Sequence, residues 1–303
     1  MKRLLVTGGN GFVGRHLLHH LNGTTPETEI LAPSLDITNH AAIEALIETT
    51  KPDALLHLAG ISAVGQAAEA PERAWAVNLH GTLHLAQSIL IHAPACQFIF
   101  ISSAEIYGRA FLRHRPVTEE TAPAPTNLYA ATKAATEMAL GAMPGLRLLR
   151  LRPANHTGPG QSPAFVIPAF ARQIARVEAG LQPPVLQSGS LEAQRDFLDV
   201  RDICAAYGKV LALPNGGAGE VLNLASGTPR RIGDLLDILL GMTRADIRLE
   251  IDQTRLRPTE IPVAQVSAAR ARACLDWRQT IPIEETLATT LAFWRKKVVT
   301  EVT

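Results

Sequence analysis

The sequence predicts an α/β fold built on a doubly wound parallel sheet, with a smaller, interleaved C-terminal lobe for substrate. A glycine-rich stretch, residues 7–14, lies between an apolar run at 4–6 and an amphipathic segment at 16–21. Apolar runs then alternate with helical patterns as far as residue 153, which is typical of a parallel sheet. Beyond that point prolines become frequent and the alternation loosens, so we expect a second lobe there.

The glycine-rich stretch reads TGGNGFVG, with glycines at 8, 11 and 14. A strand, a glycine-rich turn and a helix form the first half of a dinucleotide-binding βαβ unit, as in Rossmann folds. Glycine lets the turn close tightly and approach a pyrophosphate, and the free N–H groups of the helix start face that anion. The spacing differs from the commoner G-x-G-x-x-G, and a glycine turn without a ligand is the alternative interpretation.

The other elements follow from hydrophobic periodicity. In the first half we predict strands at 29–31, 35–37, 53–60, 98–101 and 146–151, and helices at 41–49, 74–92 and 129–143. Ligands bind at the carboxyl ends of parallel strands. The residues at or just beyond such ends are Gly8, Asp36, Gly60, Ser103 and Asn155.

The second half mixes short strands with helices. We predict strands at 185–187, 221–224 and 248–251, and helices at 165–179, 200–213, 232–242 and 283–295. We expect residues 1–155 to form the dinucleotide-binding domain, with 196–226 returning to it. Residues 156–195 and 227–303 are then the substrate-binding lobe.

Composition excludes several classes of protein. The 303 residues are 47% hydrophobic with a net charge of +1, which argues against a surface built for nucleic acid or membranes. No apolar run approaches the ~18 residues of a membrane span. Three widely spaced cysteines without C-x-x-C, and no signal-peptide pattern, predict a cytoplasmic protein. We expect no metal site, because the histidines at 16, 19 and 20 lack further ligands nearby.

Tyr129 and Lys133 stand four residues apart and therefore on one face of the predicted helix. A free tyrosine has a pKa of about 10 and exchanges protons poorly at neutral pH. A neighbouring ammonium favours the phenolate and lowers that pKa. Y-x-x-x-K also occurs by chance on surface helices. Ser103 supports a catalytic role for Tyr129 and Lys133. It lies at the end of the preceding strand, where its hydroxyl can hydrogen-bond the same oxygen that the tyrosine protonates.

Five segments in this order resemble the extended short-chain dehydrogenase/reductase family, which acts largely on nucleotide-sugars. They are residues 7–14, 58–60, 78–82 and 102–108, and Tyr129 with Lys133. The resemblance covers nearly the whole chain. It implies a cofactor site formed by Gly8, Asn10, Gly11, Phe12, Val13, Gly14, Asp36, Ile37, Leu58, Ala59, Gly60, Asn78, Tyr129 and Lys133.

Four segments of the second half, 152–161, 165–167, 189–202 and 257–260, resemble the branch that reduces the C4 ketone of GDP-4-keto-6-deoxy-D-mannose. The run NHTGPGQ at 155–161 is the most specific of them. The resemblance implies a GDP-sugar substrate and a product that is GDP-D-rhamnose or its 4-epimer, GDP-6-deoxytalose. Tyr129 would protonate the nascent alkoxide, Lys133 would tune Tyr129 and hold the nicotinamide ribose, and Ser103 would polarise the carbonyl.

Substrate contacts are implied for Ser103, Asn155, Val166, Arg195, Arg257 and Glu260. Arg195 is the best candidate for the diphosphate, because a guanidinium suits phosphate oxygens. The alternative is an ion pair with an aspartate at 196, 199 or 202. Residues 264–267 replace the family's usual glycine-aspartate step after Arg257 and Glu260. Glu105 acts as an acid/base in related dehydratases; here it either shares in catalysis, orients substrate or is an exposed loop carboxylate.

The stretch after the second strand bears on the choice of nicotinamide. An NAD enzyme usually places an acidic residue about 20 residues beyond the glycine motif. Here Ile30 to Ser34 contain no carboxylate, and the family uses the position of Asp36 for the adenine ring. Ser34, with Arg15, could bind a 2′-phosphate. We expect NADP(H) to be favoured modestly and NAD(H) to be accepted.

The resemblance also implies a homodimer whose seam is made by the predicted helices 74–92 and 129–143. Apolar candidates are Leu83, Ala86, Leu90, Met138 and Ala139, which could equally face the protein's own core. A 4-epimerase, a 4,6-dehydratase and a non-catalytic dinucleotide sensor are the alternative functions. The sensor is disfavoured because both Tyr129 and Lys133 are present.

Overall fold

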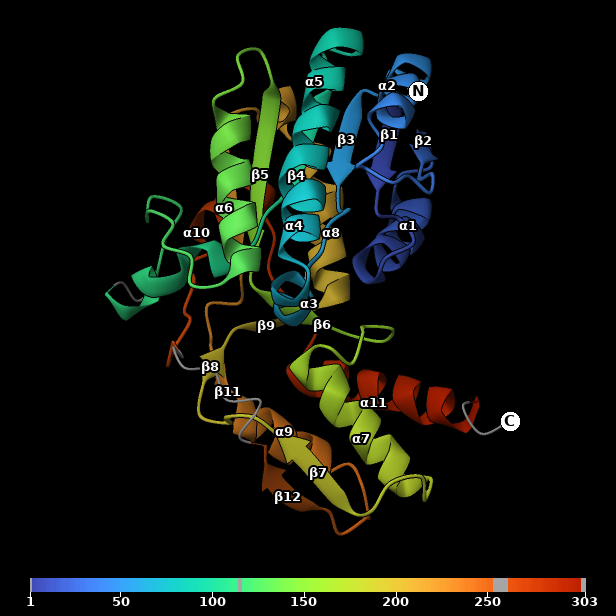
Figure 1. Cartoon of the computed structure of the whole chain (residues 1–303), viewed down its shortest axis with the longest axis vertical. Helices are drawn as coiled ribbons and strands as arrows, with labels where there is room; N and C mark the ends of the chain where they lie inside the picture. The colour runs from blue at the N-terminus through green and yellow to red at the C-terminus, as the bar shows by residue number, and fades with distance from the viewer. Residues whose placement is uncertain (1, 114–115, 253–260, 301–303) are drawn as a thin grey trace.

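The computed structural model describes residues 2–113, 116–252 and 261–300, and its centre is a six-stranded sheet (Figure 1). The strand order is β10-β5-β4-β3-β1-β2, and all neighbours are parallel. The strands are β1 Lys2–Thr7, β2 Thr28–Leu31, β3 Ala54–His57, β4 Gln97–Ile101, β5 Arg147–Pro153 and β10 Val221–Leu224. The predicted Rossmann-type α/β fold is confirmed.

Both faces of the sheet are covered by helices. Alternate side chains of β1 enter two different cores: Leu4 and Val6 pack with Leu17, whereas Leu5 packs with Ile43. The first core is closed by α1 (Phe12–Thr24) and α8 (Val200–Val210), and the second by α2 (His40–Thr50), α5 (Thr82–His92) and α6 (Leu128–Gly141). Continuous apolar strands are expected where a parallel sheet is buried on both faces.

The strand order creates a crevice beside β1. The chain passes from β1 to β2 on one side and then crosses back to β3 on the other side. Connections leaving in opposite directions open a gap at the carboxyl ends of β1 and β3, where ligands of doubly wound sheets bind. The glycine-rich loop lies at this gap, because it directly follows β1.

One predicted element is wrong, and another is less regular than predicted. Residues 35–37 form no strand, because the Asp36 carboxylate accepts hydrogen bonds from the amide and hydroxyl of Thr38 and turns the chain there. The predicted helix 74–92 is present, but a π-helical turn, η1 (Ala76–Gly81), lies between its parts α4 (Pro71–Trp75) and α5. A Cβ on Gly81 would lie 2.6 Å from the Ile37 carbonyl oxygen, so this π turn packs directly on the 35–37 segment.

Much of the second half forms a lobe beyond the carboxyl ends of the strands, whereas α8 and β10 lie with the sheet (Figure 1). Helices α7 (Val166–Glu178), α9 (Ile232–Leu240) and α11 (Ile283–Thr300) share a core of their own. The lobe also holds the pairs β7 (Val185–Ser188) with β12 (Arg248–Ile251) and β8 (Gln194–Arg195) with β11 (Arg230–Arg231). Between lobe and sheet, β6 (Asn155–Thr157) pairs with β9 (Phe197–Asp199).

Four short helical segments were not predicted. They are α3 (Val64–Glu69), η2 (Ala104–Leu112), η3 (Pro214–Gly217) and α10 (Ala269–Leu275). Among the described residues, no helix has both the length and the apolar character needed to cross a bilayer.

Candidate active site

The loop after β1 closes on glycines whose side chains would collide with backbone. Gly8 has φ +73°, and a Cβ there would lie 2.7 Å from the Ala59 nitrogen. A Cβ on Gly14 would lie 2.3 Å from the Gly8 carbonyl oxygen, which also accepts a hydrogen bond from the Gly11 amide at 2.9 Å. Glycine at these positions therefore lets α1 pack directly against the turn.

The start of α1 is prepared for an anion. Gly11 is the N-cap and supplies no capping side chain, and the first turn contains no acidic residue. The free N–H groups and the positive end of the helix dipole thus lie at the crevice beside β1. Together with the glycine turn, this geometry fits the pyrophosphate of a dinucleotide.

A segment from the second half of the chain lies against the same helix. His16 Nε2 lies 2.8 Å from the carbonyl oxygen of Pro159, and the Phe12 and His156 rings stack at 6.4 Å between centroids. Arg15 donates hydrogen bonds to the carbonyl oxygens of Asn10, at 2.6 Å, and Gly160, at 3.5 Å. The 156–160 segment therefore forms one wall beside the glycine loop.

At the end of β3, Asn78 fixes the turn that follows Leu58-Ala59-Gly60. Its Oδ1 accepts from the Ile61 amide at 2.8 Å, and its Nδ2 donates to the Ile61 carbonyl and to Thr132 Oγ1, both at 3.0 Å. The side chain is 1% exposed. Asn78 thus joins the 60–61 turn to α6, and it borders the predicted cofactor site through this turn.

The segment after β2 presents Ser34 and Asp36 at the surface, while Ile37 is buried in the core. Hydrogen bonds from the amide and hydroxyl of Thr38 lower the pKa of Asp36. The side chain of Ile37 packs with the residues of α2 and α5. Of these three predicted cofactor contacts, only Ser34 and Asp36 have exposed side chains.

The structure brings Ser103 and Tyr129 together. Asn127 caps α6 by accepting from the Ala130 amide at 2.9 Å, and Tyr129 lies in the helix's first turn. The Ser103 side chain lies close enough to the Tyr129 hydroxyl to lower its pKa, and Ser103 Oγ accepts a hydrogen bond from the Glu105 amide at 3.1 Å. Burial raises the pKa of Tyr129 to about 12, opposed by Ser103 and assisted by the Glu105 charge. The expected lowering of this pKa is therefore wrong for the protein alone.

Lys133 lies one helical turn beyond Tyr129 and is 6% exposed. Its ammonium donates to the Ile101 carbonyl at the end of β4, at 2.7 Å, and lies 4.9 Å from the centre of the Phe100 ring. Burial lowers the pKa of Lys133 to about 8, and the charge of Glu137 opposes that shift. An ideal Cβ on Gly60 would lie 3.7 Å from Nζ, so the ammonium lies at the turn that follows β3.

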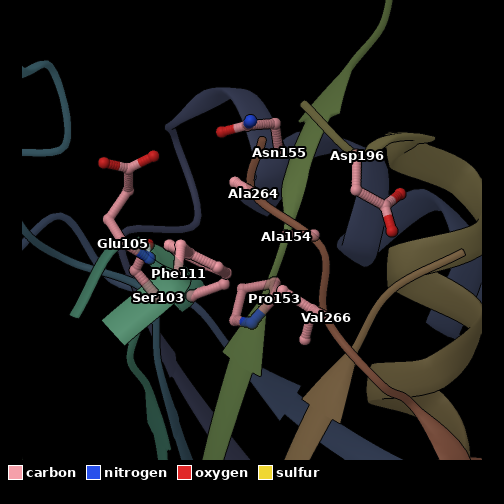
Figure 2. A pocket seen from close by; sticks show the side chains of 10 residues that line it. Ser103, Glu105, Phe111, Pro153, Ala154, Asn155, Asp196, Ala264 and Val266 are labelled. Carbon is pink, nitrogen blue, oxygen red and sulfur yellow. Dashed lines mark hydrogen bonds between the residues drawn. The ribbon is translucent and has the colours of Figure 1, made fainter. Parts of the chain in front are cut away.

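A pocket lies beside Ser103, and its walls come both from the carboxyl ends of the strands and from later parts of the chain (Figure 2). Its lining includes Ser103, Glu105, Asn155, Asp196 and Val266. In Figure 2 the Asn155 amide points to the side on which Glu105 lies, whereas the Asp196 carboxylate points away from both. The predicted residues Ser103, Glu105 and Asn155 therefore share one pocket.

Arg195 lies on β8, next to the pocket residue Asp196. Its Nη1 donates to the carbonyl oxygens of Gln194, at 2.9 Å, and Ile261, at 2.7 Å. The three aspartates offered as alternative partners have other bonds: Asp196 with the Ser226 and Gly227 amides, Asp199 with Arg201 and Thr286, and Asp202 with Thr280 and Ile281. Val166 begins α7, and Arg257 and Glu260 lie outside the described residues.

Comparison with known proteins gives a family match and full-length relatives. The model of the NAD dependent epimerase/dehydratase family matches residues 4–225. The chain belongs to this family. It is 37% identical to a GDP-6-deoxy-D-mannose reductase of Pseudomonas aeruginosa over 98% of both chains. It is 26% identical to a GDP-6-deoxy-D-talose 4-dehydrogenase of Aggregatibacter actinomycetemcomitans over 86% of each.

A solved structure of this epimerase/dehydratase family is similar over nearly the whole chain. It is described as RMD from Pseudomonas aeruginosa complexed with NADPH, and it shares 36% identity with a TM-score of 0.90. The alignment covers 98% of this chain and 100% of the other. The likeness therefore includes the lobe beyond residue 225, which the family model does not match.

Sequence reasoning missed three buried charged residues close to the predicted catalytic set. Asp196 lines the pocket, and Glu137 and Arg152 pair with each other beside Lys133. Glu137 had a signal in the sequence, since it follows Lys133 by four residues and Tyr129 by eight, on the same helical face. Among the described residues, no group of histidine, cysteine or acidic side chains is arranged to hold a metal ion.

Proposed function

We propose that this protein reduces the C4 ketone of GDP-4-keto-6-deoxy-D-mannose with NAD(P)H, giving GDP-D-rhamnose or GDP-6-deoxytalose. The observation that carries the proposal is the buried set of Ser103, Tyr129 and Lys133 at the carboxyl end of β4. This set lies between an anion-ready glycine loop and a pocket shared with the lobe. The 37% identity with a GDP-6-deoxy-D-mannose reductase, over 98% of both chains, supports the choice of substrate.

The cofactor assignment rests on the glycine loop and the start of α1. We infer that Gly8 to Gly14 hold the pyrophosphate, that Lys133 holds the nicotinamide ribose, and that Ser34 lies near the adenosine ribose. A modest preference for NADPH is supported by the absence of a carboxylate between Ile30 and Ser34. It is also supported by the relative of known structure, which is complexed with NADPH.

The catalytic roles follow from protonation states. With its pKa raised to about 12, Tyr129 is a phenol at neutral pH and has a proton to give. The reduced cofactor, when bound, supplies a hydride. Tyr129 then donates its proton to the oxygen of the former ketone, and Ser103 donates a hydrogen bond to the same oxygen as charge develops. The Lys133 ammonium stabilises the phenolate that is left behind.

We propose that residues 156–195 and 227–303 form the substrate lobe, and that residues 1–155 with 196–226 form the dinucleotide-binding domain. The pairing of β10 with β5, and of β6 with β9, supports this interleaving. Asn155 and Val166 would contact the sugar-nucleotide, and Arg195 its diphosphate. Glu105 would orient the sugar, because its carboxylate borders the pocket beside Ser103.

We also propose a cytoplasmic homodimer. Ile91 on α5 and Met138 on α6 are 69% and 71% exposed, which is unusual for large apolar side chains and suits a seam between two copies. Ala86, one of the candidates from sequence, is fully buried in the protein's own core and is removed from the seam. All three cysteines are free, which fits a reducing compartment.

The test incubates the purified protein with GDP-4-keto-6-deoxy-D-mannose and NADPH. Loss of NADPH absorbance and NMR of the product should show one 4-hydroxy sugar formed per NADPH oxidised. Conversion of a GDP-hexose with no net NADPH oxidation would instead identify an epimerase or a dehydratase. A protein that binds NADPH and converts neither sugar would be a dinucleotide sensor.

A further inference from the structure

Behind the catalytic set lies a buried ion pair that the proposed reaction does not use. Glu137 on α6 is 2% exposed and Arg152 on β5 is 5% exposed. The guanidinium holds the carboxylate at three points: Nε to Oε1 at 3.0 Å, Nε to Oε2 at 3.1 Å and Nη2 to Oε2 at 2.7 Å. Both carboxylate oxygens are therefore fixed by one partner.

Arg152 is itself fixed from the other side. Its Nη1 donates to the Tyr107 hydroxyl at 2.9 Å and to the Glu119 carbonyl at 3.2 Å. The Tyr107 hydroxyl in turn donates to Asn223 Oδ1 at 2.7 Å, which joins the pair to β10. Burial alone would lower the pKa of Arg152, but the bonds and charge of Glu137 raise it, so the guanidinium stays charged.

Stability alone does not explain such a pair. Burying two charges costs solvation, and well-packed apolar residues are often as stable or more stable in their place. The location of the pair is more informative: Glu137 is one helical turn from Lys133 on the same buried face of α6. The charge of Glu137 also raises the pKa of Lys133, against the lowering caused by burial.

The carboxylate acts on Lys133 without bonding to it. Among the described residues, the Lys133 ammonium makes no ion pair, and its hydrogen bond goes to the Ile101 carbonyl at 2.7 Å. A glutamate free to turn at this spacing would pair with the lysine and draw its ammonium away from the crevice. The three-point hold by Arg152 prevents that movement.

We propose that Glu137 is a positioning residue: held by Arg152, its carboxylate keeps buried Lys133 in the ammonium form without capturing that ammonium in an ion pair. The remaining donors of Nζ are then available on the side of the Gly60 turn. This inference rests on the catalytic role proposed for Lys133. Of the other titratable or charged groups, His57 on β3 feels the charge of Lys133, and Tyr129 lies one turn before it on α6. Glu105 on η2 acts on Tyr129, while Arg152 on β5 and Tyr107 on η2 adjoin Glu137.

The ionisation of Lys133 can be measured without substrate or cofactor. The chain has six lysines, so protein labelled with ¹³C at lysine Cε should give six resolvable signals, and Lys133→Met assigns the one of interest. Its shift is followed as pH rises. In Glu137→Gln the midpoint should fall by about one pH unit or more, because an opposite charge at helical-turn distance is lost.

Arg152→Met gives the opposite expectation. Glu137, released from its clamp, should pair with Lys133 and raise the midpoint above that of the parent. NADPH affinity at pH 7 should nevertheless fall, because the ammonium leaves the crevice. Glu178→Gln is the matched control: it breaks the exposed ion pair with Arg295 in the lobe and should leave the midpoint unchanged.

Either single variant removes one charge of the buried pair, so the double variant Glu137→Gln/Arg152→Met covers the case of misfolding. It removes both charges of the pair and should still titrate below the parent. A parental midpoint in every folded variant, or shifts of the same sign in both single variants, would overturn the proposal. Because the titration measures no turnover, its outcome does not depend on which substrate the protein uses.

Discussion

The sharpest test of the proposed chemistry is Tyr129→Phe, which removes one oxygen atom and keeps the ring. The ring is nearly buried, and the hydroxyl lies beside the Ser103 side chain. Ser103 Oγ keeps its bond from the Glu105 amide, so no side chain is left without any partner. The cost in stability should be that of one hydrogen bond, about 1 kcal/mol.

The cost in rate should be far larger. With a pKa of about 12, Tyr129 carries its proton in nearly every molecule at pH 7, so the variant loses a donor that is always ready. Loss of a positioned general acid lowers turnover about 10²–10⁴-fold, which corresponds to roughly 3–5 kcal/mol in the barrier. NADPH affinity should change little, because the glycine loop and Lys133 are untouched.

The assay follows NADPH absorbance for kcat and NADPH fluorescence for binding. Tyr207→Phe is the matched control: that tyrosine is also buried, and its hydroxyl has no hydrogen-bond partner among the described residues. It should keep parental turnover. If Tyr129→Phe also turned over at nearly the parental rate, Tyr129 would not be the proton donor.

Four further outcomes are expected. Arg195→Ala should weaken binding of GDP at least about tenfold with NADPH affinity unchanged, since charge-assisted bonds to phosphate are lost; equal GDP affinity in a calorimetric titration would remove Arg195 from the phosphate site. Light scattering at micromolar concentration should show a dimer that Met138→Glu converts to a monomer, and a monomeric parent would contradict the seam. Steady-state kcat/KM should favour NADPH over NADH by a small factor, whereas a strong NADH preference would exclude a 2′-phosphate site at Ser34. Burial, aided by the charge of Lys133, lowers the pKa of His57 to about 3 in the folded protein. Below the ordinary histidine pKa of 6.5, the unfolded chain therefore binds a proton at His57 that the folded protein does not bind. The free energy of unfolding should have its full value above about pH 6.5 and should fall by on the order of 5 kcal/mol as the pH drops toward 3. The urea midpoint should fall less steeply with decreasing pH in His57→Gln than in the parent. Parallel plots of urea midpoint against pH for the two proteins would show that His57 is not the cause of the acid sensitivity.

Features with a fixed local spacing could be predicted from the sequence. The glycines at 8, 11 and 14 imply a strand-turn-helix unit, and the structure shows the backbone contacts that exclude a Cβ at Gly8 and Gly14. The Tyr129–Lys133 spacing places both on one helical face, and the strand end at Ser103 brings the serine to them. Each inference depends only on the geometry of one element and on where it ends.

Features that depend on competition between local interactions and packing could not be predicted from the sequence. An apolar-acidic-apolar triplet at 35–37 is compatible with a strand. The Asp36 carboxylate nevertheless accepts hydrogen bonds from Thr38, and the chain forms a turn there. The lowered pKa expected for Tyr129 considers only the neighbouring lysine. Burial, which follows from packing of α6 against the sheet, outweighs it. From the sequence, Ala86 could face either a partner subunit or the protein's own core. The packing of α5 in the structure places it in the core.

The pairing of β6 with β9 explains why the proposed substrate residues should act together with the proposed catalytic set. β6 follows β5 almost directly, and the register Asn155↔Phe197 fixes Asp196 and Arg195 just before that contact. The proposed phosphate ligand is thus tied by backbone hydrogen bonds to the strand end that also borders Ser103. A rigid link of this kind means that Arg195→Ala should mainly raise KM, because the geometry at Tyr129 is set by α6 and β4. Replacing Asp196, whose carboxylate holds the Ser226 and Gly227 amides beside the pocket, should disturb both binding and turnover.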